Sequence, residues 1–462
     1  MSLLGTLQSG QRGLAVASSG IDVTAANVTG ASQPGFSRRR SVSSQLAPVQ
    51  QHGLWLGQGA NPSAVLRSTD RLLGVRLIDA TGAKASADTL AQNLRVVETY
   101  FDATNTTGLA ESLDKVFDAL GAATADPSDA SLRRGAVHAC EVFATTTSRI
   151  ASGLADTRES LDQQLATSLD EVNTSLAEIA SLNERIGKSG AEAGPADLLD
   201  RRDQVILDLA GKVGATAELK ADGQAVVYIG GHEIVAGGDW RALSVGTDAA
   251  GDTTLNVAMD NGSFNVTDVA GGKVGGLVQA RAATSDWIDT LDQFAFTMAN
   301  TFNTQHTAGF DKSGNPGGDL FSVTASATGA ATGLSVTGAI RDDPTLLAFA
   351  GAATALPGDG DNLQSLLDIE DDTTLFAAGT NPRATISDLT ADVGSQVASA
   401  AGDVEAQTAL VDDLTVLRDS VSGVDTDEEA THLLEYQSAY RAAAKVISAA
   451  DELLRTLLQI AG

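Results

Sequence analysis

The sequence predicts a mainly α (α+β) protein, in which both chain termini and the middle form long heptad-patterned helices with small antiparallel β-hairpin subdomains between them. Apolar residues recur every seven positions at both ends of the 462-residue chain. The windows 128–194 and 383–462 lack proline, which breaks helices. Between 212 and 270 the pattern changes to short apolar runs and glycine pairs, which favour β-hairpins.

Each terminal segment carries an apolar stripe on one face of an expected helix. Near the start, large residues stand seven apart, and the smaller Gly10, Ala17 and Thr24 follow the first three of them. Such a stripe is buried against a partner, either the other terminus or another molecule, because isolated helices are marginal in water. The residues that we expect in an assembly interface are Leu7, Leu14, Ile21, Val28, Leu433, Tyr436, Tyr440, Ile447, Leu454 and Leu457.

Further helices are expected in the first half of the chain. Two short ones cover 87–103 and 109–123. From Leu165 to Ile186 apolar positions alternate steps of four and three, the strongest helical signal in the middle. Pro195 suits the first turn of another helix.

The region that follows predicts a small antiparallel sheet. Segments 225–229 and 232–236 have strand patterns and are joined by Gly230-Gly231, a two-residue hairpin signal. Asn261-Gly262 predicts a second hairpin before Phe264. Helix returns from 276 to about 306, and 307–392 predicts loops, a few strands and one or two short helices.

The last helices are expected at 393–421 and from 426 to the end, with a break at Ser422-Gly423. Asp425 and Glu428 have the spacing of a capping box at the start of the final helix. The domains that we expect are a terminal helical domain of 1–45 with 393–462, a helix-rich domain of 46–310 with 360–392 that contains the sheet, and a short outer insertion at 311–359.

Charge limits the classes of partner. A net charge of −29 argues against nucleic acid, since phosphate neutralisation needs clustered Lys and Arg. Residues 1–40 are locally basic and the last sixty are acidic, which favours pairing of the two ends. We expect no membrane insertion, because no apolar run reaches spanning length. The first ten residues lack the pattern of a cleaved secretory signal, so we expect any export to proceed without signal cleavage.

The residues predict no catalytic, cofactor-binding or metal site, and we expect that the chain is not an enzyme. The five histidines are scattered without metal-ligand spacing, and the glycine pairs lack the Lys-Ser/Thr of a P-loop. Cys140, the single cysteine, lies in a helical apolar pattern and is expected to be buried and inert. For Asp200-Arg201-Arg202-Asp203 we expect local salt bridges on a helix.

Motifs at both ends resemble the signatures of bacterial flagellar rod, hook and hook-associated proteins. The N-terminal motifs are Ala26–Gly30 and Gln33–Arg38, with Phe36 where tyrosine is common in those proteins. The C-terminal motifs are Ser422–Asp425, Asp427–Glu429, Tyr436-Gln437, Ala439-Tyr440, Ala444–Ile447 and Ala450–Leu454.

Motifs in the middle narrow this resemblance to the family of flagellar hook-associated protein 1. It covers about 1–310 and 360–462. Rod and hook proteins lack such a helical middle, which argues against a rod or hook subunit, the first alternative. The motifs are Glu178–Asn183, Leu198–Asp200, Arg202–Gln204, Tyr228–Gly231, Lys273–Leu277 and Asn303–His306.

The resemblance implies a structural protein that joins the hook of the bacterial flagellum to its filament. Its terminal helices would pair, line a central channel and pack laterally between copies in a ring or tube. Implied partners are further copies of the chain, the flagellar hook protein, the next hook-associated protein (hook-associated protein 3) and an export chaperone. The implied location is extracellular, in the flagellum. An alternative of another class is a secreted adhesin or enzyme that uses its helical termini to oligomerise.

Overall fold

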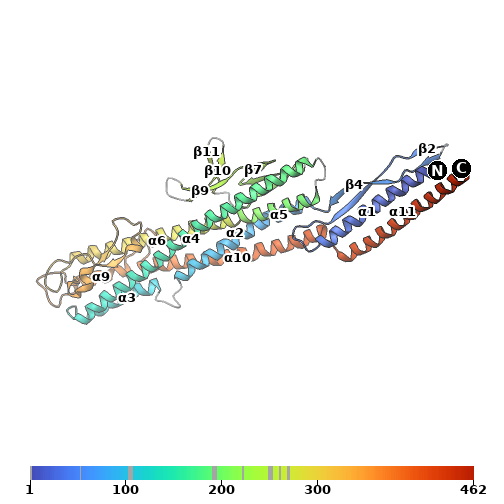
Figure 1. Cartoon of the computed structure of the whole chain (residues 1–462). Coiled ribbons are helices and arrows are strands. Elements are labelled where there is room, and N and C mark those ends of the chain that lie inside the picture. Colours follow the sequence, from blue (N-terminus) through green and yellow to red (C-terminus); the bar gives the residue numbers. More distant parts are fainter. Residues whose placement is uncertain are drawn as a thin grey trace. The chain divides into compact units, whose positions relative to one another are not determined.

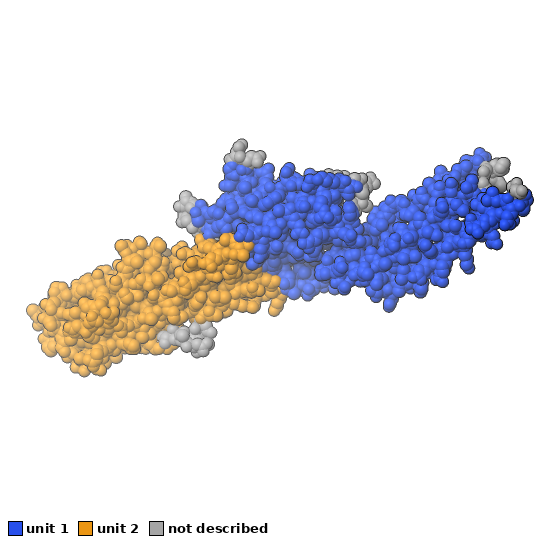
Figure 2. All heavy atoms as spheres, in the orientation of Figure 1, with its two compact units in different colours: residues 1–86, 168–275, 406–462 blue, residues 87–167, 276–405 orange. Residues whose placement is uncertain are grey.

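The fold is mainly α with small antiparallel sheets, as the sequence predicts. The computed structural model describes residues 3–51, 54–101, 108–189, 195–220, 223–247, 253–259, 262–267 and 271–461. The chain forms two compact units (Figure 2). Unit 1 comprises Met1–Ser86, Ser168–Gly275 and Ala406–Gly462, and unit 2 comprises Ala87–Thr167 and Gly276–Glu405. These divisions differ from the expected domain boundaries because four long helices contribute residues to both units.

Unit 1 contains the two terminal helices as an antiparallel pair. Helix α1 (Leu3–Gly30) lies along α11 (Thr426–Ala461), and the two chain ends lie together (Figure 1). The partner of each terminal stripe is therefore the other terminus. Strands beside the pair form two antiparallel ribbons. These strands are β1 (Arg39–Gln45) with β4 (Ala60–Arg67), and β2 (Val49–Gln51) with β3 (Leu54–Leu56).

The rest of unit 1 places two small sheets beside helices α4 (Ala130–Lys188) and α5 (Ala196–Val213). One sheet has the order β5-β6-β7-β8 and the other β11-β10-β9. The β6–β7 hairpin turns at Gly230 and Gly231, both with positive φ, as its glycine pair predicts. Asn261 lies outside the described residues. The strands are β5 (Thr216–Leu219), β6 (Ala225–Ile229), β7 (His232–Ala236), β8 (Asp239–Trp240), β9 (Leu243–Thr247), β10 (Thr253–Met259) and β11 (Gly262–Asn265).

Asparagines of α4 attach these sheets to the helix. The Asn183 side chain accepts from the Ala225 backbone N–H (2.9 Å) and donates to the Ala225 carbonyl (2.7 Å). Asn173 makes the same two bonds with Leu243, each 2.8 Å long. An amide matches a free edge of backbone in this way because it carries one acceptor and two donors.

Unit 2 is a helical bundle with one large apolar core. Segments of α2 (Arg71–Phe101), α4, α6 (Gly272–Ala308) and α10 (Pro382–Ser422) join α3 (Leu109–Ala123) around aromatic contacts such as Phe117 with Phe302. The shorter elements are β12 (Phe321–Ser322), α7 (Ala330–Gly333), β13 (Ser335–Val336), α8 (Gly338–Asp342), η2 (Pro344–Leu346), α9 (Asp361–Leu367) and η3 (Asp368–Asp371).

The segment expected as an outer insertion contributes to this core. Phe321, Ile340 and Phe349 are all buried in it. His306, at the end of α6, is fully buried: its Nδ1 faces the Gly318 carbonyl at 2.6 Å and its Nε2 accepts from the Ala348 N–H at 2.8 Å. Burial lowers the pKa of His306, so the ring stays neutral and pins the insertion to α6.

Cys140 is buried in the core of unit 2, as expected, and burial raises the pKa of its thiol to about 12. The thiolate that a nucleophile requires is thus disfavoured. Among the described residues, no helix has both the length and the apolar character to span a bilayer.

Two helices begin earlier than the sequence patterns indicated. Helix α2 starts at Arg71, where the Asp70 carboxylate accepts from the Leu73 N–H. Helix α10 starts at Pro382 behind Asn381, whose side chain accepts from the Ala384 N–H. Both starts have N-cap residues, and buried apolar residues at helical spacing follow them, such as Leu77 and Ala80 in α2 and Ile386 and Leu389 in α10. The expected break after Ser422 is present, and Asp425 caps α11 by accepting from the Asp427 N–H.

Candidate assembly site

The α1–α11 pair has a seam of small residues. Positions rise along α1 as they fall along α11, so the register is constant and antiparallel. The glycines let the helices approach closely, since a Cβ at Gly10 or Gly20 would overlap the facing side chain. The facing pairs are Gly10 with Ile447, Gly13 with Ala443, Gly20 with Tyr436 and Asn27 with Glu429.

The small residues of α1, rather than its large apolar ones, are fully buried. Burial follows heptad-like steps of seven, three, four and three from Gly10 through Ala17, Gly20 and Thr24 to Asn27. The large apolar side chains that recur every seven positions along α1 flank this seam. The sequence indicated the stripe, but close packing of the two helices moves its large members to the flank.

A glycine-to-alanine pair of variants tests the seam. A Cβ at position 20 would lie 2.5 Å from ring atoms of Tyr436, so Gly20→Ala forces the ring aside. We expect a loss of about 1–2 kcal/mol in the stability of the pair, since overpacking exceeds the gain in helix propensity. Gly13→Ala is the control, because its Cβ would contact Ala443 at an ordinary 3.5 Å. Amide exchange along α1 measures both, and equal protection in the two variants would contradict the seam.

A buried polar clamp closes the seam at the end of α1. Asn27 Nδ2 donates to Glu429 Oε2 (3.0 Å) and to the Arg39 carbonyl (2.9 Å), and Asn27 Oδ1 accepts from the Arg39 N–H (2.8 Å). Arg38 Nε donates to Glu429 Oε1 at 2.8 Å. The clamp therefore joins α1, β1 and α11, with Asn27 and Glu429 only 1% and 2% exposed.

Arg38 also reaches Glu428, at 3.1 Å. The bond to Glu428 raises the pKa of Arg38, although partial burial opposes this, and the Glu429 carboxylate adds to the rise. The same bond lowers the pKa of Glu428. Both groups are thus held in their charged forms at the root of the pair. Glu428 pairs with Arg38, a contact that its capping-box spacing does not predict.

The expected interface residues surround the seam but leave apolar surface open. Three of them, Val28, Tyr440 and Leu457, are exposed. Leu7, Leu14, Ile21, Leu433, Tyr436, Ile447 and Leu454 are half-buried. Further exposed apolar side chains on α11 continue this surface, which we call the outer stripe and which comprises Val446, Leu453, Leu457 and Ile460.

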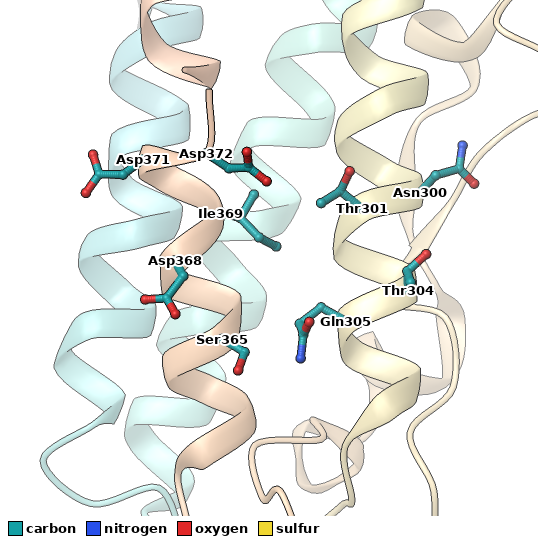
Figure 3. A pocket seen from close by; sticks show the side chains of 9 residues that line it. All are labelled: Asn300, Thr301, Thr304, Gln305, Ser365, Asp368, Ile369, Asp371 and Asp372. Atoms are coloured by element: carbon teal, nitrogen blue, oxygen red, sulfur yellow. The ribbon is translucent and has the colours of Figure 1, made fainter. Parts of the chain in front are cut away.

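Unit 2 contains a hollow that differs in character from the apolar outer stripe. It is an open cleft of about 700 Å³ between α6 and the α9–η3 segment (Figure 3). Its lining is polar, with three carboxylates on one side and hydroxyls and amides of α6 on the other. Within the described ranges, no three His, Cys, Asp or Glu residues are grouped as a metal site requires. We assign this cleft no chemistry.

Comparison with known proteins shows which family the chain resembles. Residues 94–321 match the model of the "Flagellar hook-associated protein FlgK helical domain", and residues 419–460 match "Flagellar basal body rod FlgEFG protein C-terminal". Flagellar hook-associated protein 1 of Escherichia coli is 24% identical, over 97% of this chain and 98% of its own length. The chain is thus similar to flagellar hook-associated protein 1 over nearly its whole length. Relatives of the same name from Salmonella typhimurium (26% identical, 97% and 98% covered) and Bacillus subtilis (25%, 97% and 96%) agree.

The chain also shares its fold with a protein of known structure. The flagellar hook junction protein FlgK from Burkholderia pseudomallei superposes with a TM-score of 0.64 at 18% identity, over 75% of this chain and all of that one. The motif residues Asn27, Arg38, Glu429 and Tyr436, which suggested the family, are those that hold the α1–α11 pair together.

Proposed function

We propose that this chain is a structural subunit of the junction between flagellar hook and filament, exported and assembled outside the cell. It assembles through its terminal pair and carries no catalysis. The observation that supports this proposal is the outer stripe on α11. It gains its meaning from the similarity of the chain to flagellar hook-associated protein 1. Contiguous apolar surface of this kind favours a protein partner.

The partners follow from the position of the outer stripe. Leu453 and Leu457 lie one turn apart on α11, three and seven residues beyond the buried Ala450, and both are exposed although they follow the same helical face. A neighbouring copy is the proposed occupant, and repeated contact of one face with another closes a ring. The hook protein and hook-associated protein 3 are the proposed axial neighbours, and an export chaperone the proposed partner before assembly.

Loss of the outer stripe should abolish assembly without unfolding the chain. The test is the double variant Leu453→Ser, Leu457→Ser, at positions 58% and 51% exposed. We expect at least about tenfold weaker binding to purified hooks, since each buried apolar side chain contributes about 1.5–3 kcal/mol. Val96→Ser, an exposed position in unit 2, is the control. Deletion of 1–40 and 425–462 is the stronger variant, and hook binding that survives either change would refute the proposal.

A further inference from the structure

Five charged residues connect the ribbon at the root of the terminal pair to helix α5, and one of them, Asp197, is an exposed partner of Arg39. The other four are shielded from water to a greater degree. We call them the joint: Arg39 on β1, Arg67 on β4, and Asp200 and Asp203 on α5. Arg67 Nη1 lies 2.8 Å from Asp200 Oδ1 and 2.9 Å from Asp203 Oδ2. Arg39 Nη2 lies 3.1 Å from Asp200 Oδ2. Each oxygen of Asp200 thus holds a different arginine.

These ion pairs are shielded from water. The side chains of Arg39, Arg67 and Asp200 are only 11%, 12% and 10% exposed. Burial by itself lowers the pKa of Arg67, but Asp203 and Asp200 more than offset this and raise it. Removal of Asp200 takes away the carboxylate that both arginines share and leaves each with one other, Asp197 for Arg39 and Asp203 for Arg67.

Local salt bridges, expected from the sequence for this part of α5, are therefore the minor part of its contacts. Arg202 does pair with its neighbour Asp203, and Arg201 pairs with Glu178 of α4. Asp200 instead reaches strands more than 130 residues away in the sequence. No spacing on one helix predicts this contact, because the partners come from the ribbon.

Apolar packing at the joint is thin. A cavity of about 180 Å³ lies beside Arg67 and Asp203, with Phe36, Leu73 and Ile206 among its walls. Arg39 Nε is buried and has no hydrogen-bond partner, and its guanidinium lies 4.7 Å from the centre of the Phe36 ring. A void removes the dispersion contacts that hold two bodies at a fixed angle. The charges, rather than side-chain packing, therefore hold the ribbon on α5.

The chain itself also links these parts at two places, from β4 to α2 and from α10 to α11. Gly423 follows the last residue of α10, and the Arg38 N–H donates to the Ser422 carbonyl at 2.9 Å. One backbone bond of this kind permits rotation about it. The joint adds to these links a charged side-chain contact that can set the direction of the terminal pair within unit 1.

We propose that Arg39, Arg67, Asp200 and Asp203 are positioning residues that fix the angle between the α1–α11 pair and α5, and so present the outer stripe to the next copy. This inference rests on the proposed function for its consequence in assembly. The angle itself is a property of the single chain and can be measured there.

Distance measurements between spin labels on the full chain test the angle. With Cys140→Ser as background, Ser448→Cys on α11 and Glu233→Cys on β7 place both labels on exposed positions of unit 1. We expect one narrow distance distribution, which Asp200→Asn broadens. Arg201→Gln is the matched control, because it removes an ion pair from the same helix outside the joint. A distribution that stays narrow in Asp200→Asn would overturn the proposal.

A second variant covers the case that Asp200→Asn does not fold. Arg67→Lys keeps the charge but lacks the planar fork that contacts two carboxylates, and it should broaden the distribution in the same sense. If both variants leave it unchanged, the joint does not set the angle.

Hook binding separates this inference from the proposed function. If the joint holds the pair in the binding-competent direction, and its loss leaves about a tenth of molecules competent, Asp200→Asn weakens hook binding about tenfold. Normal binding by Asp200→Asn, with binding lost in the Leu453→Ser, Leu457→Ser variant, would overturn only the joint. Normal binding by the latter variant would refute the proposed function, whatever the distances show.

Discussion

Replacing Glu429 by alanine is expected to separate the two terminal helices at their root. Glu429 is buried and accepts from both Asn27 and Arg38. Its removal leaves the Arg39 carbonyl as the acceptor for Asn27 and the exposed Glu428 as the partner of Arg38. The loss of these two hydrogen bonds to a charged group is expected to cost about 3 kcal/mol, at about 1.5–3 kcal/mol for each bond. Amide exchange of α1 and the start of α11 should report this loss, and hook binding should fall with it.

Neighbouring and conservative changes at the same place make this result specific. Glu428→Ala removes the second carboxylate that pairs with Arg38. Because the Glu428 side chain is 51% exposed, this change should lower the stability of the helix pair far less. Glu429→Gln keeps an acceptor for Asn27 but loses the charge, and should fall between the two. If Glu429→Ala and Glu428→Ala have equal effects, burial of the clamp contributes nothing to the pair.

The terminal helices could be predicted from the sequence, but their contact could not. The spacing of Leu7, Leu14 and Ile21 correctly indicates a helix with one apolar face. It does not indicate that Gly20 lies against Tyr436, because a glycine has no side chain to score in a hydrophobic pattern. The role of the polar Asn27 could not be predicted from the sequence either, because it depends on where β1 and α11 lie in the fold.

The ribbon of β1 and β4 shows a related limit. Its residues are mostly polar and exposed, from Arg39 to Gln45, so alternation of apolar residues is missing. Strands β6 and β7 are correctly predicted because Val226 and Val227 are buried and Gly230 marks the turn. Edge ribbons that are held by ion pairs leave little signal, and the joint could therefore not be predicted.

Asn183→Ala is the second variant with a large expected effect, here on the sheet of unit 1. Asn183 is fully buried, and it satisfies both the N–H and the carbonyl of Ala225. Alanine leaves two buried backbone groups unpaired, each of which costs about 1–3 kcal/mol. We expect a loss of about 2–5 kcal/mol in the free energy of unfolding, measured by denaturant titration, and rapid exchange of the Ala225 amide.

Asn173 provides the comparison that isolates burial. It makes the same pair of bonds, to Leu243, but is only half-buried, so water can replace it in Asn173→Ala. The loss should therefore be clearly smaller there, although geometry and chemistry are the same. Equal losses would mean that the number of hydrogen bonds, and not their burial, determines how strongly helix α4 holds its sheets. A larger loss at Asn183 would show why a polar residue occupies a buried position of the heptad pattern: it hydrogen-bonds both backbone groups of Ala225 at the start of β6.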